Sequence, residues 1–574
     1  MKRINQKTLR KKYLNLFYRD NHCLYVLAIF SNVLMILGNL GISWLLQQVL
    51  DAANGEENTF SLSTLFAIAV ILFAANLFIG LLQYHTIPAF SARAMRQFKD
   101  GIFSEIIKKD YSAFNKENTS VYLSFLTNDA SSIESNYLFS SFNLIMCSLS
   151  FLGAFAMMVW YSQTLTIVAI LLALIPASIS MMAGNRLADA EKMVSEKRVN
   201  YIDTLKDCLV GFSVIKSFKV ERQVEKLLAD CNQNAEDAKC RRQKISTAIQ
   251  TVAGVAGVAA QLGVFLVGAW LALSRNEVTA GVVVVFVNLM NYIIQPITEL
   301  PGIIANRKAA LTLIDRIAAE VSSNVRDQGV SIKNTLSREI KFDNVCFGYE
   351  QESTVLKSIN ISFKAGKSYA IVGPSGCGKS TMLNLLMASQ GEYSGNIFFD
   401  DIELRKIGTT SLYDLVSIIQ QNVFVFNASI RDNVTMFKDF PQSEVEKAIE
   451  LSGLVNLIHE RGDSYCCGEN GTGLSGGEKQ RIAIARSLLR KTPVLLIDEA
   501  TAALDAETAF EISNAILDLD KLTKIVVTHK LDEQTLKRYD AIITMKAGSV
   551  VEIGSFDELM KNKGYFFSLY TVSK

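Results

Sequence analysis

Long stretches without a charged residue dominate the first half of the chain. Five of them occur, at residues 21–50, 58–92, 135–185, 245–274 and 278–298. About 20 consecutive apolar residues are enough to cross a bilayer as a helix. The longest stretch therefore predicts two crossings, with a turn near the polar residues 161–164. The pattern predicts six transmembrane helices, several of them long enough to continue into the cytosol.

The pattern changes after residue 318. Residues 319–336 lose the apolar periodicity and are typical of a linker. From residue 337 to residue 574, short apolar strands such as Val494–Ile497 and Lys524–Thr528 alternate with helical stretches, which indicates an α/β fold. We therefore expect an all-α six-helix transmembrane domain at 1–318, the linker, and an α/β domain at 337–574.

Positive charge is concentrated at the N-terminus. Residues 1–19 hold seven Lys or Arg and no acidic residue, and they place Leu9, Tyr13, Leu16 and Phe17 at helical spacing. Such a stretch predicts an amphipathic helix lying on the membrane surface.

The same charge asymmetry predicts the orientation, because basic residues favour the cytosolic side. The segments 93–134 and 186–244 are then cytosolic loops, and the acidic segment 51–57 is an outer loop. We expect an integral membrane protein of a bacterial plasma (inner) membrane, with its N-terminus and its α/β domain in the cytosol.

Overall composition excludes several other classes of protein. The formal net charge is only +2, so a nucleic-acid partner is not expected. The nine cysteines show no C-x-x-C spacing, which indicates reduced thiols rather than a disulfide framework. With four histidines in the chain, no His/Cys metal cluster is expected.

A phosphate-binding loop is the clearest motif of the α/β domain. Residues 373–381 fit the pattern G-x-x-x-x-G-K-[ST] between a short apolar strand and a helix. In such a loop, backbone N–H groups surround the phosphates, the lysine contacts the β- and γ-phosphates, and the following hydroxyl binds Mg²⁺. The candidate nucleotide-binding residues are Gly373, Pro374, Ser375, Gly376, Cys377, Gly378, Lys379, Ser380 and Thr381.

Two carboxylates follow the apolar strand Val494–Ile497. In a nucleotide site, the first of them, Asp498, would hold Mg²⁺, and the second, Glu499, would polarise the attacking water. A strand that ends in two acids is a weak signal by itself. It becomes strong because it follows a phosphate loop in the same domain.

A second device for binding phosphate begins at Ser475. Ser475 and Glu478 match the S-x-x-E capping box, and Gly476 and Gly477 lie between them. The N-terminus of the predicted helix 478–489 is then an anion site. One Mg-ATP needs only one such device from each chain, so the simplest arrangement sandwiches each ATP between two chains that meet head to tail.

The last predicted membrane helix carries a polar stripe. Asn288, Asn291, Gln295 and Glu299 fall within about 80° of arc at 100° per residue. Polar groups inside a membrane tend to face a bundle interior or a cavity, so these residues are candidates for a substrate cavity. Glu299 is near the inner end of the stretch, and a position at the membrane interface is the alternative.

Together, these motifs resemble the ATP-binding cassette (ABC) transporter family, specifically half-transporters of the exporter fold. The resemblance covers essentially the whole chain, because six helices and one cassette occur in the family's order. It implies a second half-transporter as partner. The patches 111–114 and 208–215 fall where the family has its coupling helices.

The resemblance also assigns roles to single residues. Tyr349 corresponds to the aromatic that stacks on adenine, and Gln421 to the glutamine that contacts Mg²⁺ and the attacking water, although the adjacent Gln420 leaves the register open. Ser475 and Gly477 correspond to signature residues that contact the partner's nucleotide. Asp505 fits the loop that crosses the dimer interface, and His529 the switch histidine.

The resemblance implies an ATP hydrolase that drives transport by alternating access, with Glu499 as general base. Export of an amphipathic or hydrophobic drug, lipid or peptide is the expected direction, and import of a metal chelate or another small molecule is the alternative. Both hydrolytic and signature residues are intact, which favours a homodimer over a heterodimer with one degenerate site. A non-transporting regulator or channel is the third reading, and the intact residues argue against it.

Overall fold

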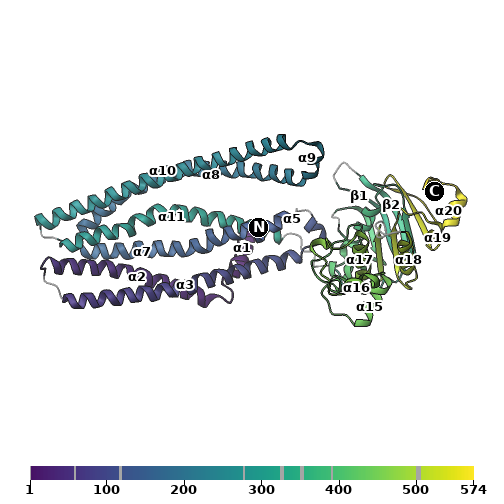
Figure 1. The fold of residues 1–574 in the computed structure, drawn as a ribbon, viewed down its shortest axis with the longest axis horizontal. Helices are drawn as coiled ribbons and strands as arrows, with labels where there is room; N and C mark the ends of the chain where they lie inside the picture. The colour runs from purple at the N-terminus through teal and green to yellow at the C-terminus, as the bar shows by residue number, and fades with distance from the viewer. Residues whose placement is uncertain are drawn as a thin grey trace. The chain divides into compact units, whose positions relative to one another are not determined.

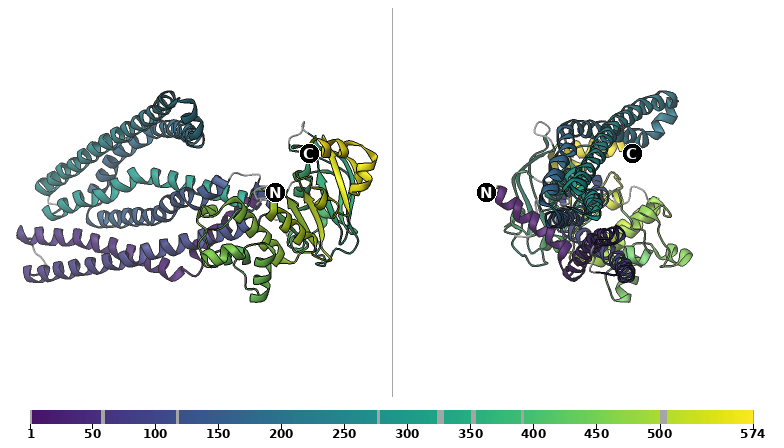
Figure 2. Two further views of the ribbon diagram at one scale, coloured as in Figure 1. Left: turned by 45° about the vertical axis from the view of Figure 1, so that its right-hand side comes forward. Right: turned by 90° about the vertical axis from the view of Figure 1, so that its left-hand side faces the viewer.

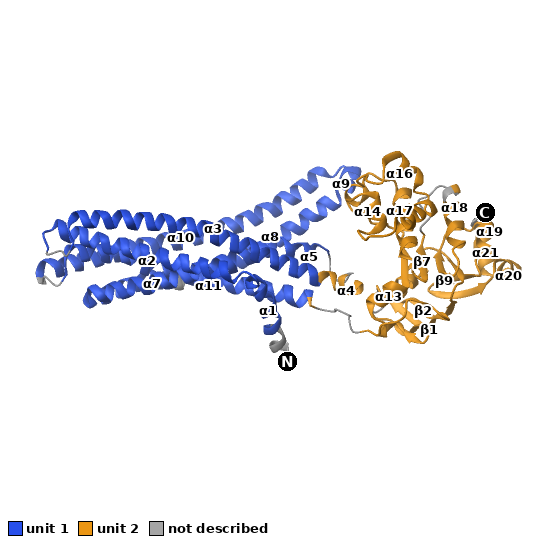
Figure 3. Ribbon diagram, turned by 90° about the horizontal axis from the view of Figure 1, so that it is seen from below, with its two compact units in different colours: residues 1–105, 119–321 blue, residues 106–118, 322–574 orange. Residues whose placement is uncertain are grey.

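The computed structural model describes residues 2–56, 60–115, 119–275, 278–322, 329–349, 354–389, 392–499 and 506–573. The chain forms two compact units (Figure 3), one from residues 1–105 and 119–321 and the other from residues 106–118 and 322–574. The short segment 106–118 thus belongs by its contacts to the C-terminal unit, although it lies between two helical regions of the N-terminal half.

Long helices build the first unit (Figure 1). In the described residues, six of them exceed 20 residues: α2 (His22–Ala53), α3 (Leu62–Ile107), α7 (Ser140–Tyr161), α8 (Gln163–Val210), α10 (Glu221–Arg275) and α11 (Ala280–Val321). Five helical spans have the length and composition of a membrane crossing, and α8 adds the shorter apolar stretch Gln163–Ile179. The predicted helical membrane domain is confirmed.

Shorter helices connect the long ones. They are α1 (Lys2–Tyr18), α5 (Thr119–Leu126), α6 (Asn128–Ile133), the π-helix η1 (Glu134–Phe139) and α9 (Phe212–Phe218). The turn predicted near residues 161–164 is confirmed, because α7 ends at Tyr161 and Ser162 caps α8 by accepting a hydrogen bond from the Leu165 amide at 3.3 Å.

The helices α8 and α10 lie side by side and continue together to α9, which joins them (Figure 2). None of the residues of α9 is buried. Its aromatic residues Phe212 and Phe218 are 58% and 74% exposed. The predicted patch at 208–215 is therefore an exposed apolar surface at the end of a helical hairpin.

The N-terminal helix α1 forms as predicted, but its apolar face is not left for lipid. Phe17 is fully buried, and its ring stacks on Phe98 of α3 at 4.8 Å between centroids and on Tyr137 at 5.8 Å. Arg10 pairs with Asp315 near the end of α11. The aromatic side chains of the apolar face thus pack into the helical unit, and the position of α1 at the membrane surface stays a prediction.

Asp51 also departs from its predicted place in an exposed acidic loop. The helix α2 continues to Ala53, and Asp51 is only 3% exposed. Its Oδ1 accepts a hydrogen bond from the Gly281 amide at 3.0 Å, at the first turn of α11. Tyr161 donates to Gln47, one turn before Asp51, at 3.2 Å. A buried carboxylate therefore connects the ends of α2, α7 and α11.

Two β-sheets organise the second unit. In the described residues, the larger has the order β10-β9-β3-β8-β7-β6 and the smaller the order β2-β1-β4-β5. The strands are β1 (Glu339–Gly348), β2 (Thr354–Lys364), β3 (Ser368–Val372), β4 (Ser394–Phe399), β5 (Ile402–Glu403), β6 (Val416–Ile419), β7 (Val494–Asp498), β8 (Thr523–Val527), β9 (Ala541–Lys546) and β10 (Ser549–Gly554).

The second unit also contains short helices. They are α4 (Tyr111–Asn115), α12 (Lys379–Leu386), α13 (Thr409–Leu415), α14 (Ile430–Thr435), α15 (Gln442–Leu451), α16 (Val455–Arg461), α17 (Gly476–Arg490), α18 (Ala506–Leu517), α19 (Glu533–Leu536), α20 (Phe556–Asn562) and α21 (Tyr565–Ser573), with the 3₁₀ turns η2 (Leu404–Lys406) and η3 (Glu469–Gly471). The predicted α/β domain is confirmed.

The topology of the larger sheet places the motifs together. The central strand β3 pairs in parallel with β8, and β8 pairs in parallel with β7. Their carboxyl ends therefore share one edge of the sheet, where ligands bind in open α/β folds. The phosphate loop follows β3, the two carboxylates end β7, and His529 follows β8.

Candidate functional site

The phosphate loop has a backbone that only glycine allows at two positions. Gly373 has a φ of +155° and Gly378 a φ of +101°. A Cβ at Gly373 would lie 2.4 Å from the Met545 carbonyl oxygen, and one at Gly378 would lie 2.6 Å from Leu356 Cδ2. The loop therefore remains a backbone-lined cradle, which fits a phosphate group approached by amide N–H donors.

Lys379 begins the helix α12 under this loop. Its side chain is buried, and Nζ donates to the carbonyl oxygens of Gly373 and Pro374, each at 3.0 Å. The ammonium group is thus held inside the cradle. Cys377 is also buried, with 3% of its surface exposed, and this burial raises the pKa of its thiol. A buried thiol with a raised pKa is expected to react slowly with thiol reagents.

Ser380 joins the phosphate loop to the first strand-end carboxylate. Its hydroxyl donates to Asp498 Oδ1 at 2.9 Å. Burial raises the pKa of Asp498, while the hydrogen bond from Ser380 opposes that shift. A hydroxyl and a carboxylate oxygen at one point are hard ligands of the kind that Mg²⁺ prefers.

Glu499 is held at both of its carboxylate oxygens. Gln421 Nε2 donates to Oε2 at 3.0 Å, and His529 Nε2 contacts Oε1 at 2.7 Å. Glu499 also has a left-handed φ of +52°, a conformation that is uncommon for non-glycine residues. The contact is made by Gln421 and not by Gln420, which favours the register chosen from the sequence.

Tyr349 lies close to the other end of the loop. Its hydroxyl is 3.2 Å from Thr381 Oγ1, and its ring makes an edge contact with Phe347 at 5.1 Å. The side chain remains 58% exposed, so a ring face is available for stacking on a planar base.

The Ser475 segment has the predicted capping box. The Glu478 amide donates to Ser475 Oγ at 3.2 Å, and the Ser475 amide donates to Glu478 Oε2 at 2.6 Å. Gly476 and Gly477 form the first turn of α17. Among the described residues, no hydrogen bond or ion pair links this segment to the phosphate loop or to Glu499. Asp505 lies outside the described residues.

Comparison with known proteins identifies both units. Residues 25–297 match the ABC transporter transmembrane region family, and residues 356–502 match the ABC transporter family. The chain belongs to the ABC transporter family. It is an integral membrane protein that binds ATP and couples its hydrolysis to transport.

Relatives and a solved structure extend over nearly the whole transporter. The chain is 28% identical to the ATP-dependent lipid A-core flippase of Photobacterium profundum, covering 97% of this chain and 96% of that protein. The flippase of Wigglesworthia glossinidia brevipalpis is also 28% identical, covering 92% and 91%. A bacterial Atm1-family ABC exporter with ATP bound has a TM-score of 0.84 at 22% identity, covering 96% and 99%, and shows the exporter fold.

Two residues that sequence reasoning missed connect the nucleotide site of the transporter to α17. Arg486 donates through Nε to the Asn433 carbonyl at 2.6 Å and through Nη1 to the Phe424 carbonyl at 2.6 Å. Asn433 is fully buried and exchanges hydrogen bonds with the backbone of Phe426. These contacts fix the chain that follows Gln421. No local motif identifies them, because the partners are distant in sequence.

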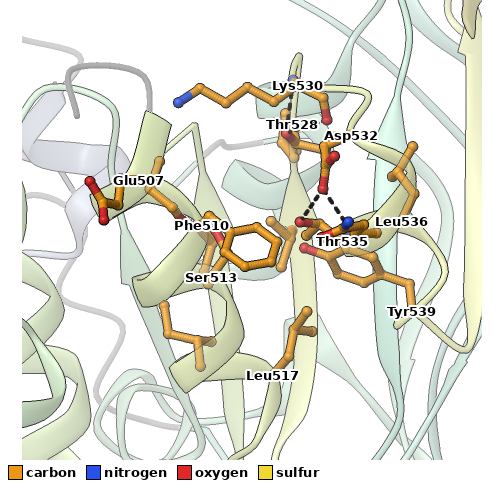
Figure 4. Close-up of a pocket in the computed structure, with 16 residues that line it drawn as sticks. Glu507, Phe510, Ser513, Leu517, Thr528, Lys530, Asp532, Thr535, Leu536 and Tyr539 are labelled. Atoms are coloured by element: carbon orange, nitrogen blue, oxygen red, sulfur yellow. Dashed lines mark hydrogen bonds between the residues drawn. The ribbon is translucent and has the colours of Figure 1, made fainter. Parts of the chain in front are cut away.

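A cavity of about 550 Å³ lies between α18 and the segment that follows β8 (Figure 4). Phe510 and Leu517 of α18 and Tyr539 form part of its wall, and Thr528, which precedes His529, closes it at the end of β8. Asp532 points to Thr535, whose amide and hydroxyl donate to it. None of the predicted site residues lines this cavity, so it is separate from the phosphate cradle.

The four predicted cavity residues of the transporter contact different partners. Ser43 of α2 donates to Asn288 at 3.2 Å, and Gln261 of α10 donates to Asn291 at 2.6 Å. Gln295 donates to Glu299 at 3.1 Å, one turn away on α11. Asn288 and Asn291 thus contact neighbouring helices, Gln295 and Glu299 pair with each other on α11, and a role for the stripe in a substrate cavity stays a prediction.

Proposed function

We propose that the chain is one half of an ATP-driven exporter that carries an amphipathic, lipid-like substrate across a bacterial inner membrane by alternating access. The observation that supports this most directly is Glu499, held between Gln421 and His529 beside the phosphate cradle, in a chain that also spans the membrane. The flippase activity of the relatives supports a lipid as substrate.

The phosphate cradle fits Mg-ATP. The amides of the loop and the N-terminus of α12 would surround the phosphates, and Lys379 would neutralise part of their charge. Ser380 and Asp498, already in contact at 2.9 Å, would hold Mg²⁺. When bound, Mg²⁺ supplies positive charge that balances the charge developing on the transferred phosphoryl group.

Glu499 acts as the general base. A water that attacks the γ-phosphate loses its proton to the Glu499 carboxylate, and Gln421 and His529 orient that carboxylate through Oε2 and Oε1.

The complete site needs a second chain. Among the described residues, no hydrogen bond links the N-terminus of α17, with Ser475 and Gly477, to the phosphate loop or Glu499, which supports its serving the phosphates held by the partner subunit. A homodimer is favoured because this chain carries both the base and the signature residues. Asp505 would cross the interface between the two cassettes.

The segment 106–118 couples the cassette to the membrane helices. It begins with the last two residues of the long helix α3, yet it belongs by its contacts to the C-terminal unit. Thr409, the first residue of α13, donates to Asp110 at 2.8 Å. A movement of the cassette is therefore transmitted to the cytosolic end of α3 through α4. The exposed α9 offers a second surface on which a cassette can dock. On this proposal α4, α9 and the N-terminus all lie on the cytosolic side of the membrane.

Substitution of the base tests the proposal. Glu499→Gln keeps the hydrogen bond with Gln421 but cannot accept a proton, so ATP should still bind while hydrolysis falls about 10²–10⁴-fold. The measurements are nucleotide binding, ATP turnover, and ATP-dependent uptake of a fluorescent phospholipid into inside-out vesicles. Near-normal turnover would refute the assignment, and uptake only into right-side-out vesicles would indicate import. Glu511→Gln, at an exposed position on α18, is the control.

A further inference from the structure

A small polar cavity lies between three helices of the membrane unit. It has a volume of about 190 Å³ and is lined by residues of α2 (Ile36, Asn39, Leu40), α7 (Met146, Cys147, Ser150) and α11 (Tyr292, Gln295, Pro296). Ligand pockets for whole drug-sized molecules usually have about 300–1,000 Å³. This cavity is therefore of a size to receive a headgroup, while the rest of an amphiphile remains outside it.

A carboxylate stands at the edge of this cavity. Gln295 Nε2 donates to Glu299 Oε1 at 3.1 Å, and the Cys147 thiol approaches Glu299 Oε2 at 4.0 Å. Both partners line the cavity. They are neutral, so they orient the negative charge of Glu299 without cancelling it.

In the part of the chain that the structure describes, no cation pairs with Glu299. The stretches 21–50, 135–185 and 278–298 contain no Lys or Arg, and among the described residues no ion pair includes Glu299. Arg307 lies eight residues further along α11, about 12 Å away along the axis. It is occupied by the Ser141 hydroxyl at 2.8 Å and the face of Tyr137 at 4.8 Å.

An acid without a cation partner, inside or at the edge of a bilayer, usually faces a bundle interior or a water-filled cavity and marks a functional position. In a homodimer, the partner's helices have the same uncharged stretches and supply none. The cavity also contains the aromatic ring of Tyr292 and the amide of Asn39. A carboxylate, an aromatic ring and amide oxygens are the groups that recognise an organic ammonium ion.

We propose that this cavity, with Glu299 at its edge, is a subsite for the ammonium group of an amphipathic substrate. The inference rests on the proposed function and names its substrate class: lipids or drugs whose headgroup carries an exposed amine or quaternary ammonium. An anionic headgroup meets no basic side chain in these uncharged stretches and is repelled by Glu299.

The test uses two probes that differ in charge alone. One is a dansyl-labelled alkyl chain ending in trimethylammonium, and the other is the same chain ending in the isosteric tert-butyl group. Stimulation of ATP turnover is measured with each probe for the full-length protein in proteoliposomes. The wild type should reach half-maximal stimulation at about tenfold lower concentration of the ammonium probe.

Three variants separate the possible outcomes. Glu299→Gln should abolish the preference for the ammonium probe, Glu299→Asp should keep part of it, and the exposed Glu225→Gln should keep all of it. An equal shift for both probes in Glu299→Gln, or stronger stimulation of the wild type by a sulfonate analogue, would overturn the subsite. Glu499→Gln is the control for the proposed function. If ATP turnover does not depend on Glu499, the proposed mechanism fails, whereas the preference for the ammonium probe is judged only from the Glu299 variants.

Discussion

At the scale of single residues, the nucleotide site depends on side chains whose partners lie far away in sequence. Glu499 meets Gln421 and His529 only because β6, β7 and β8 are parallel neighbours. Arg486 also contacts residues that are distant from it in sequence. Burial lowers its pKa to about 10, so the guanidinium group is still charged at neutral pH. It directs that charge to backbone carbonyl groups rather than to an acid.

Removal of Arg486 should destabilise the cassette and slow it. Arg486→Ala leaves the carbonyl oxygens of Asn433 and Phe424 without their donor, at a cost of about 3 kcal/mol in the free energy of unfolding. Because these residues follow Gln421, ATP turnover should fall as well. Thermal unfolding and ATPase assays measure the two effects. Lys447→Ala, at an exposed position of α15, is the control, and an unchanged melting temperature of Arg486→Ala would contradict this role.

At the scale of elements, two helices of the described residues begin with capping boxes of the same geometry. Ser475 and Glu478 begin α17, and Ser555 and Glu558 begin α20. Each should stabilise its helix to a similar extent. Only the Ser475 box is proposed to contact a nucleotide. Comparing the two boxes therefore separates the stabilising effect of a helix cap from an effect on ATP turnover.

Ser475→Ala and Ser555→Ala should each cost about 1 kcal/mol of stability. Only Ser475→Ala should also lower ATP turnover, by about 10²-fold, because it removes a donor to the developing charge on the phosphate. Melting temperatures and turnover of the two purified variants make the comparison. Equal turnover in both would show that the N-terminus of α17 serves only as a helix cap.

A substitution in the first turn of α11 tests its close contact with the buried Asp51 carboxylate of α2. A Cβ at Gly281 would lie 2.4 Å from Asp51 Oδ1 and 2.7 Å from the Gln47 carbonyl oxygen. Gly281→Ala should therefore lower stability by about 1–3 kcal/mol. Gly302→Ala, on the same helix with nothing within 4 Å, should be neutral or slightly stabilising. Thermal unfolding in nanodiscs compares them, and equal melting temperatures would contradict the close contact.

These elements also show what the sequence could predict. The phosphate loop, the strand-end carboxylates and the Ser475 capping box are local patterns, and each has the predicted geometry. The local sequence places Asp51 in an outer loop. Its burial depends on a hydrogen bond from Gly281, which is 230 residues away, so no local pattern predicts it. The packing of Phe17 against Phe98 is missed for the same reason, since an amphipathic pattern does not say whether lipid or protein covers the apolar face.

At the scale of the whole molecule, the phosphate loop is half of a site. The cassette brings together the loop, both carboxylates, Gln421 and His529, but it leaves the Ser475 end unconnected to them among the described residues. If each ATP lies between two chains, one chain supplies Glu499 to a given site and the other chain supplies Ser475. A mixed dimer of two defective chains then distinguishes a shared site from one built within a single chain.

In a dimer of one Glu499→Gln chain and one Ser475→Ala chain, shared sites place both defects in one site and leave the other site intact. Sites within one chain would leave every site with a defect. We therefore expect the mixed dimer, purified through two different affinity tags, to hydrolyse ATP well above either variant homodimer and up to about half the wild-type rate if the two sites act independently. Activity no higher than that of the two homodimers would argue against the sandwich arrangement, or would show that the transporter needs both sites in each cycle. ATP trapping in the mixed dimer separates these outcomes, because a shared intact site still closes over one nucleotide.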